Sequence, residues 1–270
     1  MSPSRAPAAG PAKPGFTVPS WVIPGTYLEN LRFLADKPEI RGVELLFFLY
    51  DGDIRAQLEA EWRGILEYRD RFSFTAHLPD RLLPEHGELV ERLSPLVRHF
   101  IVHPGPPEEA EAMGALLRSW AGQLRAADNR SGDRRTGRGP FLVENTLSGR
   151  LPAILPYLDE DTGLCMDTGH LLLEGQSPAD FLRRHGDRVG EIHLHGLDRA
   201  KADRDGRLPD HRPLRAGDPW LTELAPLLAG FAEPVNLEVF SWEEVTESLA
   251  VLETLFIANS NTQRRDHENH

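Results

Sequence analysis

Residues 163–173 read GLCMDTGHLLL, an apolar run that carries an acid, Asp167, and an imidazole, His170. A carboxylate buried without a partner costs on the order of several kcal/mol, or takes up a proton. A bound cation would be a suitable partner, and carboxylates and imidazoles are both common ligands of divalent metals. The segment therefore indicates a metal site to which Asp167 and His170 contribute.

Other short apolar segments carry side chains of the same kind near their ends. They are His77 in FSFTAHLP, His103 in HFIVHPG, Glu144 in FLVENT, His193 and His195 in EIHLHG, His211 in the segment that follows, and Glu238 in VNLEVF. A single inward histidine is often a hydrogen-bonded core residue, and a loop aspartate often caps a helix. Gathered at one place, however, these groups would repel one another or stay unsatisfied without a cation. The set therefore predicts metal binding.

The segments that carry these residues are expected to be strands of one barrel. Eight runs read as strands: 16–20, 42–48, 72–79, 99–105, 141–146, 163–169, 191–196 and 235–240. Amphipathic, helix-like stretches separate them, and eight such units in this length predict an α/β fold of the (β/α)8 TIM-barrel type. A doubly wound open sheet is the alternative, but no glycine-rich nucleotide turn follows the first strand.

Strand alternation supports the barrel. If the metal-capable residues point inward, their neighbours must face the surrounding helices. Those neighbours are all apolar: Ala76, Val102, Val143, Met166, Ile192, Leu194, Leu237 and Val239. The metal-capable residues lie at or near the C-terminal ends of the strands, which form the active face of this fold. The basic stretch 131–139 leads into a strand, so we expect it on the opposite face, as a solvated loop.

Composition limits the domain organisation and the partners. The 270 residues predict a barrel domain over 16–257, between a disordered N-terminal tail, 1–15, and a flexible C-terminal tail, 258–270. One cysteine excludes a disulfide framework and a thiolate-rich metal site, and it suits a reducing cytoplasm. No apolar run of about 18 residues predicts a membrane span. The net charge of −12 disfavours long nucleic acid and anionic lipid as partners and leaves a small-molecule substrate.

The motifs AHLP, HPG, ENT, DTGH, HLHG and LEVF together resemble the xylose-isomerase-like superfamily of TIM barrels. This superfamily contains sugar isomerases and epimerases, abasic-site nucleases of the endonuclease IV type, and cobamide-remodelling phosphodiesterases. The resemblance spans about residues 16 to 257. PSWVIPGTYLENLRFLADK, GVELLFFLYD, DTGHLLLEG and DHRPL are most similar to the cobamide-remodelling branch.

The resemblance implies the metal ligands. In the isomerases one ion is held by residues that match Glu144, Asp167, His193 and Glu238. The nuclease branch adds a second ion, at positions that match His77 and His103, with Glu144 as the bridge. Its third site matches His170 and His211, but Pro209 stands where that branch has a loop aspartate. The resemblance therefore implies two divalent ions, zinc or manganese, and leaves open whether Asp210 completes a third site.

Two bridged ions suit phosphodiester hydrolysis, because one activates water and the other neutralises phosphate or alkoxide oxygens. The favoured function is hydrolysis of the nucleotide-loop phosphodiester of a cobamide, giving cobinamide phosphate. A metal-dependent sugar or sugar-phosphate isomerase or epimerase is the alternative, with a non-catalytic ligand-binding barrel behind it. An abasic-site nuclease fits poorly, since the loop LYDGD is short and acidic where a DNA-gripping loop would be basic.

The remaining roles follow from position. Glu144 would bridge the metals, while His170, His195 and His211 would contact the phosphate, hold a weaker metal or protonate the leaving oxygen. Glu44 is expected to form a salt bridge low in the barrel or to orient a ligand. Trp21 and Tyr50 end the first two strands and would either wall the substrate pocket or pack against rim loops.

Overall fold

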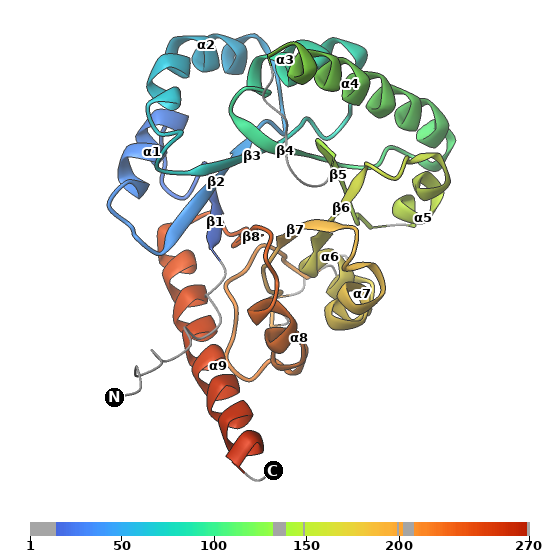
Figure 1. The fold of residues 1–270 in the computed structure, drawn as a ribbon. Helices are drawn as coiled ribbons and strands as arrows, with labels where there is room; N and C mark the ends of the chain where they lie inside the picture. Colours follow the sequence, from blue (N-terminus) through green and yellow to red (C-terminus); the bar gives the residue numbers. More distant parts are fainter. Residues whose placement is uncertain (1–14, 132–138, 148, 199, 202–207, 269–270) are drawn as a thin grey trace, which may run out of the picture.

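The computed structural model describes residues 15–131, 139–147, 149–198, 200–201 and 208–268 (Figure 1). Eight parallel strands pair in chain order and close into one barrel, so the predicted (β/α)8 fold is confirmed. They are β1 Phe16–Pro19, β2 Ile40–Leu46, β3 Ser73–His77, β4 Val97–Val102, β5 Phe141–Glu144, β6 Gly163–Asp167, β7 Val189–His193 and β8 Val235–Asn236. Each predicted strand segment overlaps one of them, although β2, β4 and β7 begin two residues earlier than predicted.

Helices surround the barrel (Figure 1). They are α1 Tyr27–Leu34, α2 Gly52–Leu66, α3 Gly87–Leu93, α4 Ala110–Ser131, α5 Arg150–Ile154, α6 Thr168–Leu173, α7 Pro178–His185, α8 Pro219–Ala229 and α9 Trp242–Glu268, with 3-10 turns at Pro84–His86, Pro107–Glu109 and Leu155–Tyr157. Side-chain caps start several of them: Thr26 forms a capping box with Glu29 at α1, and Asp51 accepts hydrogen bonds from two backbone amides at α2. No described helix is both long enough and apolar enough to span a bilayer.

Alternation along the strands divides the side chains as expected. The outward neighbours of the metal-capable residues, such as Ala76, Val102 and Ile192, are buried in one large core between barrel and helices. Inside the barrel, Ile101, Leu142 and Cys165 form a small apolar cluster of their own. Each lies two residues before a metal-capable residue, so this cluster is the layer beneath the polar ring.

The largest differences from the predicted boundaries are in β8 and α9. β8 pairs only at Val235–Asn236, and the chain leaves the ladder before Glu238. α9 continues through Glu268, across most of the segment predicted as a flexible tail, because no glycine or proline between 258 and 268 interrupts the helix. Residues 1–14 of the predicted N-terminal tail and 132–138 of the basic stretch lie outside the described residues.

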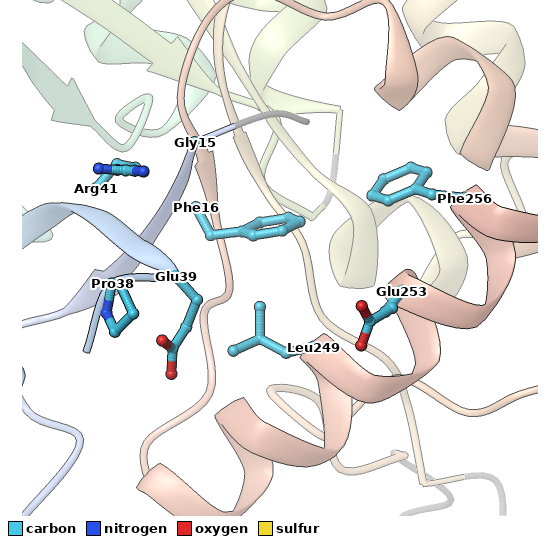
Figure 2. A pocket seen from close by; sticks show the side chains of 8 residues that line it. All are labelled: Gly15, Phe16, Pro38, Glu39, Arg41, Leu249, Glu253 and Phe256. Atoms are coloured by element: carbon cyan, nitrogen blue, oxygen red, sulfur yellow. The ribbon is translucent and has the colours of Figure 1, made fainter. Parts of the chain in front are cut away.

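The N-terminal end of the barrel carries a pocket of about 270 Å³ between the start of β1, the segment before β2 and α9 (Figure 2). Phe16, Leu249 and Phe256 form its apolar part. It opens where the strands begin, so it lies at the other end of the barrel from the metal-capable residues.

Candidate metal centre at the barrel mouth

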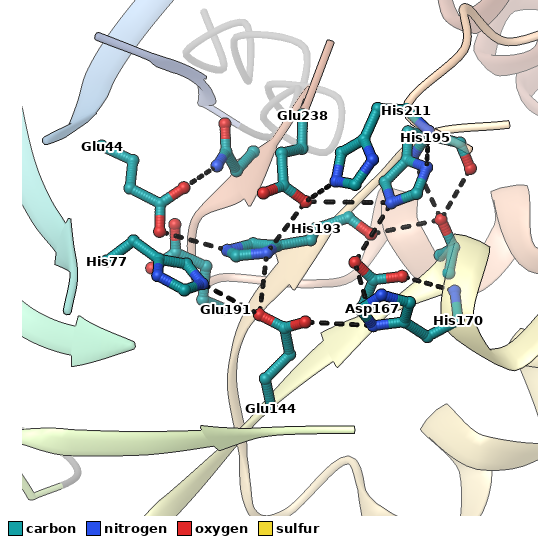
Figure 3. A network of polar contacts seen from close by, with 12 residues as sticks. Glu44, His77, Glu144, Asp167, His170, Glu191, His193, His195, His211 and Glu238 are labelled. Carbon is teal, nitrogen blue, oxygen red and sulfur yellow. Dashed lines mark hydrogen bonds and ion pairs between the residues drawn. The ribbon is translucent and has the colours of Figure 1, made fainter. Parts of the chain in front are cut away.

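Glu144, the last residue of β5, lies at the centre of the metal-capable ring (Figure 3). Its Oε2 lies 3.4 Å from His77 Nε2 and 3.4 Å from His193 Nδ1. Its Oε1 lies 3.5 Å from His103 Nε2 and 3.1 Å from His170 Nδ1. One buried carboxylate therefore faces four imidazoles from four parts of the chain, which is the position a bridging ligand would occupy.

His77, His103 and Glu144 form the first donor group. His77 ends β3, and its Nδ1 lies 2.9 Å from the carbonyl oxygen of Leu78. His103 follows β4, and its Nδ1 lies 3.3 Å from Asp80 Oδ1. Each ring is thus anchored on its outer nitrogen and presents Nε2 to Glu144, as metal-binding histidines commonly do. Their donor atoms all lie within 4.8 Å of one another, so one ion could contact all three.

The second position is marked by buried atoms that lack a hydrogen-bond partner among the described residues. Glu144 Oε2, His193 Nδ1 and Glu238 Oε2 are all of this kind. His193 Nδ1 lies 3.4 Å from the first and 3.1 Å from the second of these oxygens. Ligands about 2.0–2.2 Å from a shared ion are separated by about this much. Buried polar atoms without a partner are costly, and a divalent cation beside His193 Nδ1 is a partner that these atoms could share.

A further donor group comprises Asp167, His195, His211 and Glu238. His211 Nε2 lies 3.5 Å from Glu238 Oε2, and its Nδ1 lies 3.3 Å from Asp210 Oδ1. Asp210 thus anchors His211 as Asp80 anchors His103. The His195 and His211 rings stack with centroids 4.3 Å apart. Asp210 therefore lies behind a donor of the group, on the side of the ring away from Glu238.

His195 makes a contact that defines its tautomer. The His211 backbone amide donates a hydrogen bond of 2.9 Å to His195 Nδ1, so the proton of a neutral ring must reside on Nε2. That nitrogen lies 3.1 Å from Asp167 Oδ2 and donates to it. In this arrangement His195 orients Asp167, whereas His193 presents an unpaired nitrogen to the acids.

The DTGH segment serves both as helix start and as part of the site. Asp167 ends β6 and caps α6, its Oδ1 accepting a hydrogen bond of 2.6 Å from the His170 amide. Its Oδ2 remains for the site. Gly169 must be glycine, because an added Cβ would lie 2.0 Å from His195 Cε1. Thr168 accepts a hydrogen bond from the His195 amide and so ties α6 to the chain beyond β7.

A deeper polar layer lies beneath His193. His193 Nε2 lies 3.3 Å from Glu44 Oε1, and Asn236 donates to the other Glu44 oxygen. Glu44 therefore has the contact that the sequence suggested, low in the barrel. Glu191, which sequence reasoning did not single out, faces the same space and accepts a hydrogen bond from Thr75. Glu191 lies two residues before His193 and four before His195, so strand alternation would have placed all three side chains on the inner face of the barrel.

Electrostatics inside the ring favour ion pairs. Burial lowers the pKa of His103, but the charges of Glu144 and Asp80 outweigh it and raise that pKa to about 10. The balance is similar for His170, where Asp167 and Glu144 raise the pKa to about 9, and for His211, where Glu238 and Asp210 raise it to about 11. At neutral pH without metal these rings carry protons, which a binding ion must displace.

The two central acids are ionised. Burial alone would raise the pKa of Glu144, but the surrounding histidines, His103 foremost, hold it well below its ordinary value. His193 and His211 have the same effect on Glu238. Burial and the neighbouring Glu44 instead raise the pKa of Glu191 well above its ordinary value, which favours the neutral form of this acid. The histidines therefore favour negative charge on the two ring acids, whereas the layer below favours the neutral form of Glu191.

The two aromatic residues at the ends of the first strands lie differently. Trp21 is 56% exposed at the mouth. Tyr50 packs edge-on against Phe47 and His86, so it belongs to the packing of the rim.

The chain matches no protein-family model and no curated protein. Among solved structures it resembles a D-tagatose 3-epimerase-like protein, with a TM-score of 0.61, 17% identity, and 92% of this chain and 99% of that chain covered. It also resembles endonuclease IV from Thermus thermophilus, with a TM-score of 0.54, 17% identity and coverages of 92% and 100%. The chain has the xylose-isomerase-like barrel fold. A third such structure, the IOLI protein with a bound zinc atom, matches with a TM-score of 0.59, 14% identity and coverages of 90% and 97%.

Proposed function

We propose that this protein is a divalent-metal-dependent enzyme that hydrolyses a phosphodiester in a small molecule at the barrel mouth. The observation that carries the proposal is the position of Glu144, whose carboxylate forms one donor group with His77 and His103 and also lies 3.4 Å from His193, which in turn faces Glu238. His77 and His103 would complete one ion site, and His193 and Glu238 the other. Two ions sharing a carboxylate suit phosphodiester hydrolysis, whereas an isomerase needs only one.

The bound ions would supply a nucleophilic hydroxide at neutral pH and would neutralise phosphate oxygens. The chain's own residues contribute positive charge and protons at the rim. His170 and His211 are partly exposed and carry protons in the metal-free protein, so each could bind a non-bridging oxygen or hold a proton near the leaving oxygen. Asp210 keeps His211 oriented for this role.

For the substrate, we propose the nucleotide-loop phosphodiester of a cobamide. The support is the resemblance of segments such as DTGHLLLEG and DHRPL to the cobamide-remodelling branch, together with the net charge of −12, which disfavours a long polyanion. The products would be a cobinamide phosphate and a base riboside.

A metal-dependent sugar isomerase or epimerase is the second candidate. His193 and Glu238 could hold a single ion without the His77 group, and several of the similar solved structures are named as sugar phosphate isomerase/epimerase or as epimerase. This reading leaves His77 and His103 as substrate hydrogen-bonding groups.

The test combines metal analysis with three substrate classes. The protein is stripped with a chelator, reloaded with zinc or manganese, and assayed with a cobamide, with bis(p-nitrophenyl) phosphate and with a panel of ketoses. We expect about two ions per chain and metal-dependent cleavage of the phosphodiesters. Glu144→Gln should abolish activity, while the matched change Glu191→Gln in the deeper layer should preserve it. Interconversion of ketose epimers without phosphodiester cleavage would replace the first candidate by the second.

A further inference from the structure

A pocket of about 360 Å³ opens beside the metal centre, at the ends of β1 and β2. Trp21, Phe48, Leu49 and Ile54 contribute its apolar lining. The Phe48 ring packs edge-on against the His77 ring with centroids 4.6 Å apart. One aromatic ring therefore separates this pocket from the first donor group, and a small substrate could reach both.

Several large apolar side chains are exposed to solvent along this part of the rim. Trp21 is 56% exposed and Leu49 is 73% exposed. Phe240, just beyond β8, is 38% exposed and packs against the His211 ring at 5.1 Å. The Trp242 amide donates to the Val22 carbonyl oxygen at 2.8 Å, so the segments after β8 and β1 lie against each other. We call Trp21, Leu49 and Phe240 the apolar arc.

Most polar groups that line the pocket already serve the fold. Ser20 Oγ accepts a hydrogen bond of 3.1 Å from the Leu46 amide. The Tyr27 hydroxyl donates one of 2.9 Å to the Leu46 carbonyl oxygen. Asp51 accepts from two amides at the start of α2. Gln57 adds one amide to the lining. A polyol bound here would leave hydroxyl groups poorly paired, which is unfavourable, whereas a flat apolar ring would lose little.

We propose that the apolar arc and its pocket bind a flat, weakly polar heteroaromatic base of the substrate, while the phosphodiester lies on the metal centre. This inference rests on the proposed hydrolase function and specifies its substrate class: a phosphodiester that carries such a base. Trp21 would stack on the base, and Leu49 and Phe48 would enclose its edge. The pocket size is at the lower end for small-molecule sites, about 300–1,000 Å³, and so suits one fused ring system.

The proposal is tested by calorimetric titration of the metal-loaded protein with a benzimidazole nucleoside, adenosine and ribose. We expect the benzimidazole nucleoside to bind most tightly, because the pocket offers few groups to pair with the polar edge of adenine. Trp21→Ala should weaken this binding about tenfold, since loss of one stacking side chain typically has about this effect. Leu49→Asp should weaken it at least as much.

The matched control is Ile257→Asp, which places the same charge on another exposed apolar residue, in α9. It should leave the affinity unchanged, and all three variants should keep their metal content and melting temperature. Equal binding of ribose and the benzimidazole nucleoside, or equal loss in Leu49→Asp and Ile257→Asp, would overturn the proposal. Because the titration requires no turnover, an inactive protein that still binds the base would count against the hydrolase function and leave the base site standing.

Discussion

Glu144 and Glu191 provide a test of the charge distribution, because both are buried barrel glutamates whose surroundings act in opposite directions. The histidines around Glu144 lower its pKa against the effect of burial. Burial and Glu44 raise the pKa of Glu191. The surroundings therefore favour the carboxylate form of Glu144 and the neutral form of Glu191, so the same change, Glu→Gln, should have different effects at the two positions.

The magnitudes follow from the contacts. Glu144→Gln removes a negative charge that faces four imidazole nitrogens at 3.1–3.5 Å. Removing one partner of a buried ion pair typically costs about 3–5 kcal/mol, and we expect a loss of this size in the metal-free protein. Glu191→Gln replaces one neutral group by another that can still accept from Thr75. Because burial disfavours the charged form of Glu191, replacing it with a neutral amide should leave the protein as stable as the wild type or make it more stable.

Urea unfolding of the chelator-treated variants at pH 7, followed by tryptophan fluorescence, measures the two free energies of unfolding. Metal analysis of the reloaded proteins gives an independent readout, with ions lost from Glu144→Gln and retained by Glu191→Gln. Equal destabilisation by the two changes, or a larger loss for Glu191→Gln, would show that charge is not distributed as described. The electrostatic account of the ring would then be wrong.

Three further experiments address the same centre. The pKa of His211 is raised from 6.5 to about 11, so its stabilising effect in the metal-free protein is complete below about pH 6.5 and is lost as pH rises through about 11; the urea midpoint of chelated protein should fall across this range. Asp210→Asn should weaken metal binding at the donor group that contains His211 and Glu238 by about tenfold, as loss of an anchoring carboxylate commonly does, and an unchanged zinc affinity would argue against its anchoring role. Gly169→Ala should displace His195 and lower both melting temperature and metal content, whereas Gly122→Ala, with open space around it in α4, should stabilise by about 0.5–1 kcal/mol.

The strands and the inward orientation of the ring were predictable because both depend on local alternation. The residue that precedes each of Glu144, Asp167 and His193 is apolar, and this pattern marks each strand without any knowledge of the neighbouring strands. The C-terminal location of the polar residues then predicted that they would meet at one end of the barrel.

The partners of the individual rings could not be predicted in this way. His193 and His195 both point into the barrel, but they lie at different depths. A ring nitrogen of His193 therefore faces Glu238, whereas a ring nitrogen of His195 donates to Asp167. Asp80 reaches His103 from a loop that carries no periodic pattern. The length of β8 depends on where its neighbours stop pairing, which is a tertiary property.

The shortness of β8 affects how the barrel is closed. Among the described residues, the β8 ladder comprises Val235 and Asn236, and backbone hydrogen bonds on each side, such as those from Leu237 to Thr17 and from Ile192 to Pro234, add to the pairing with β1 and β7. Glu238 lies two residues after Asn236, and its Oε2 lies 3.1 Å from Nδ1 of His193, the last residue of the neighbouring strand β7. An ion bound by both Glu238 and His193 would link β7 to the segment that follows β8. Metal binding would then help to close the barrel and complete the site at the same time.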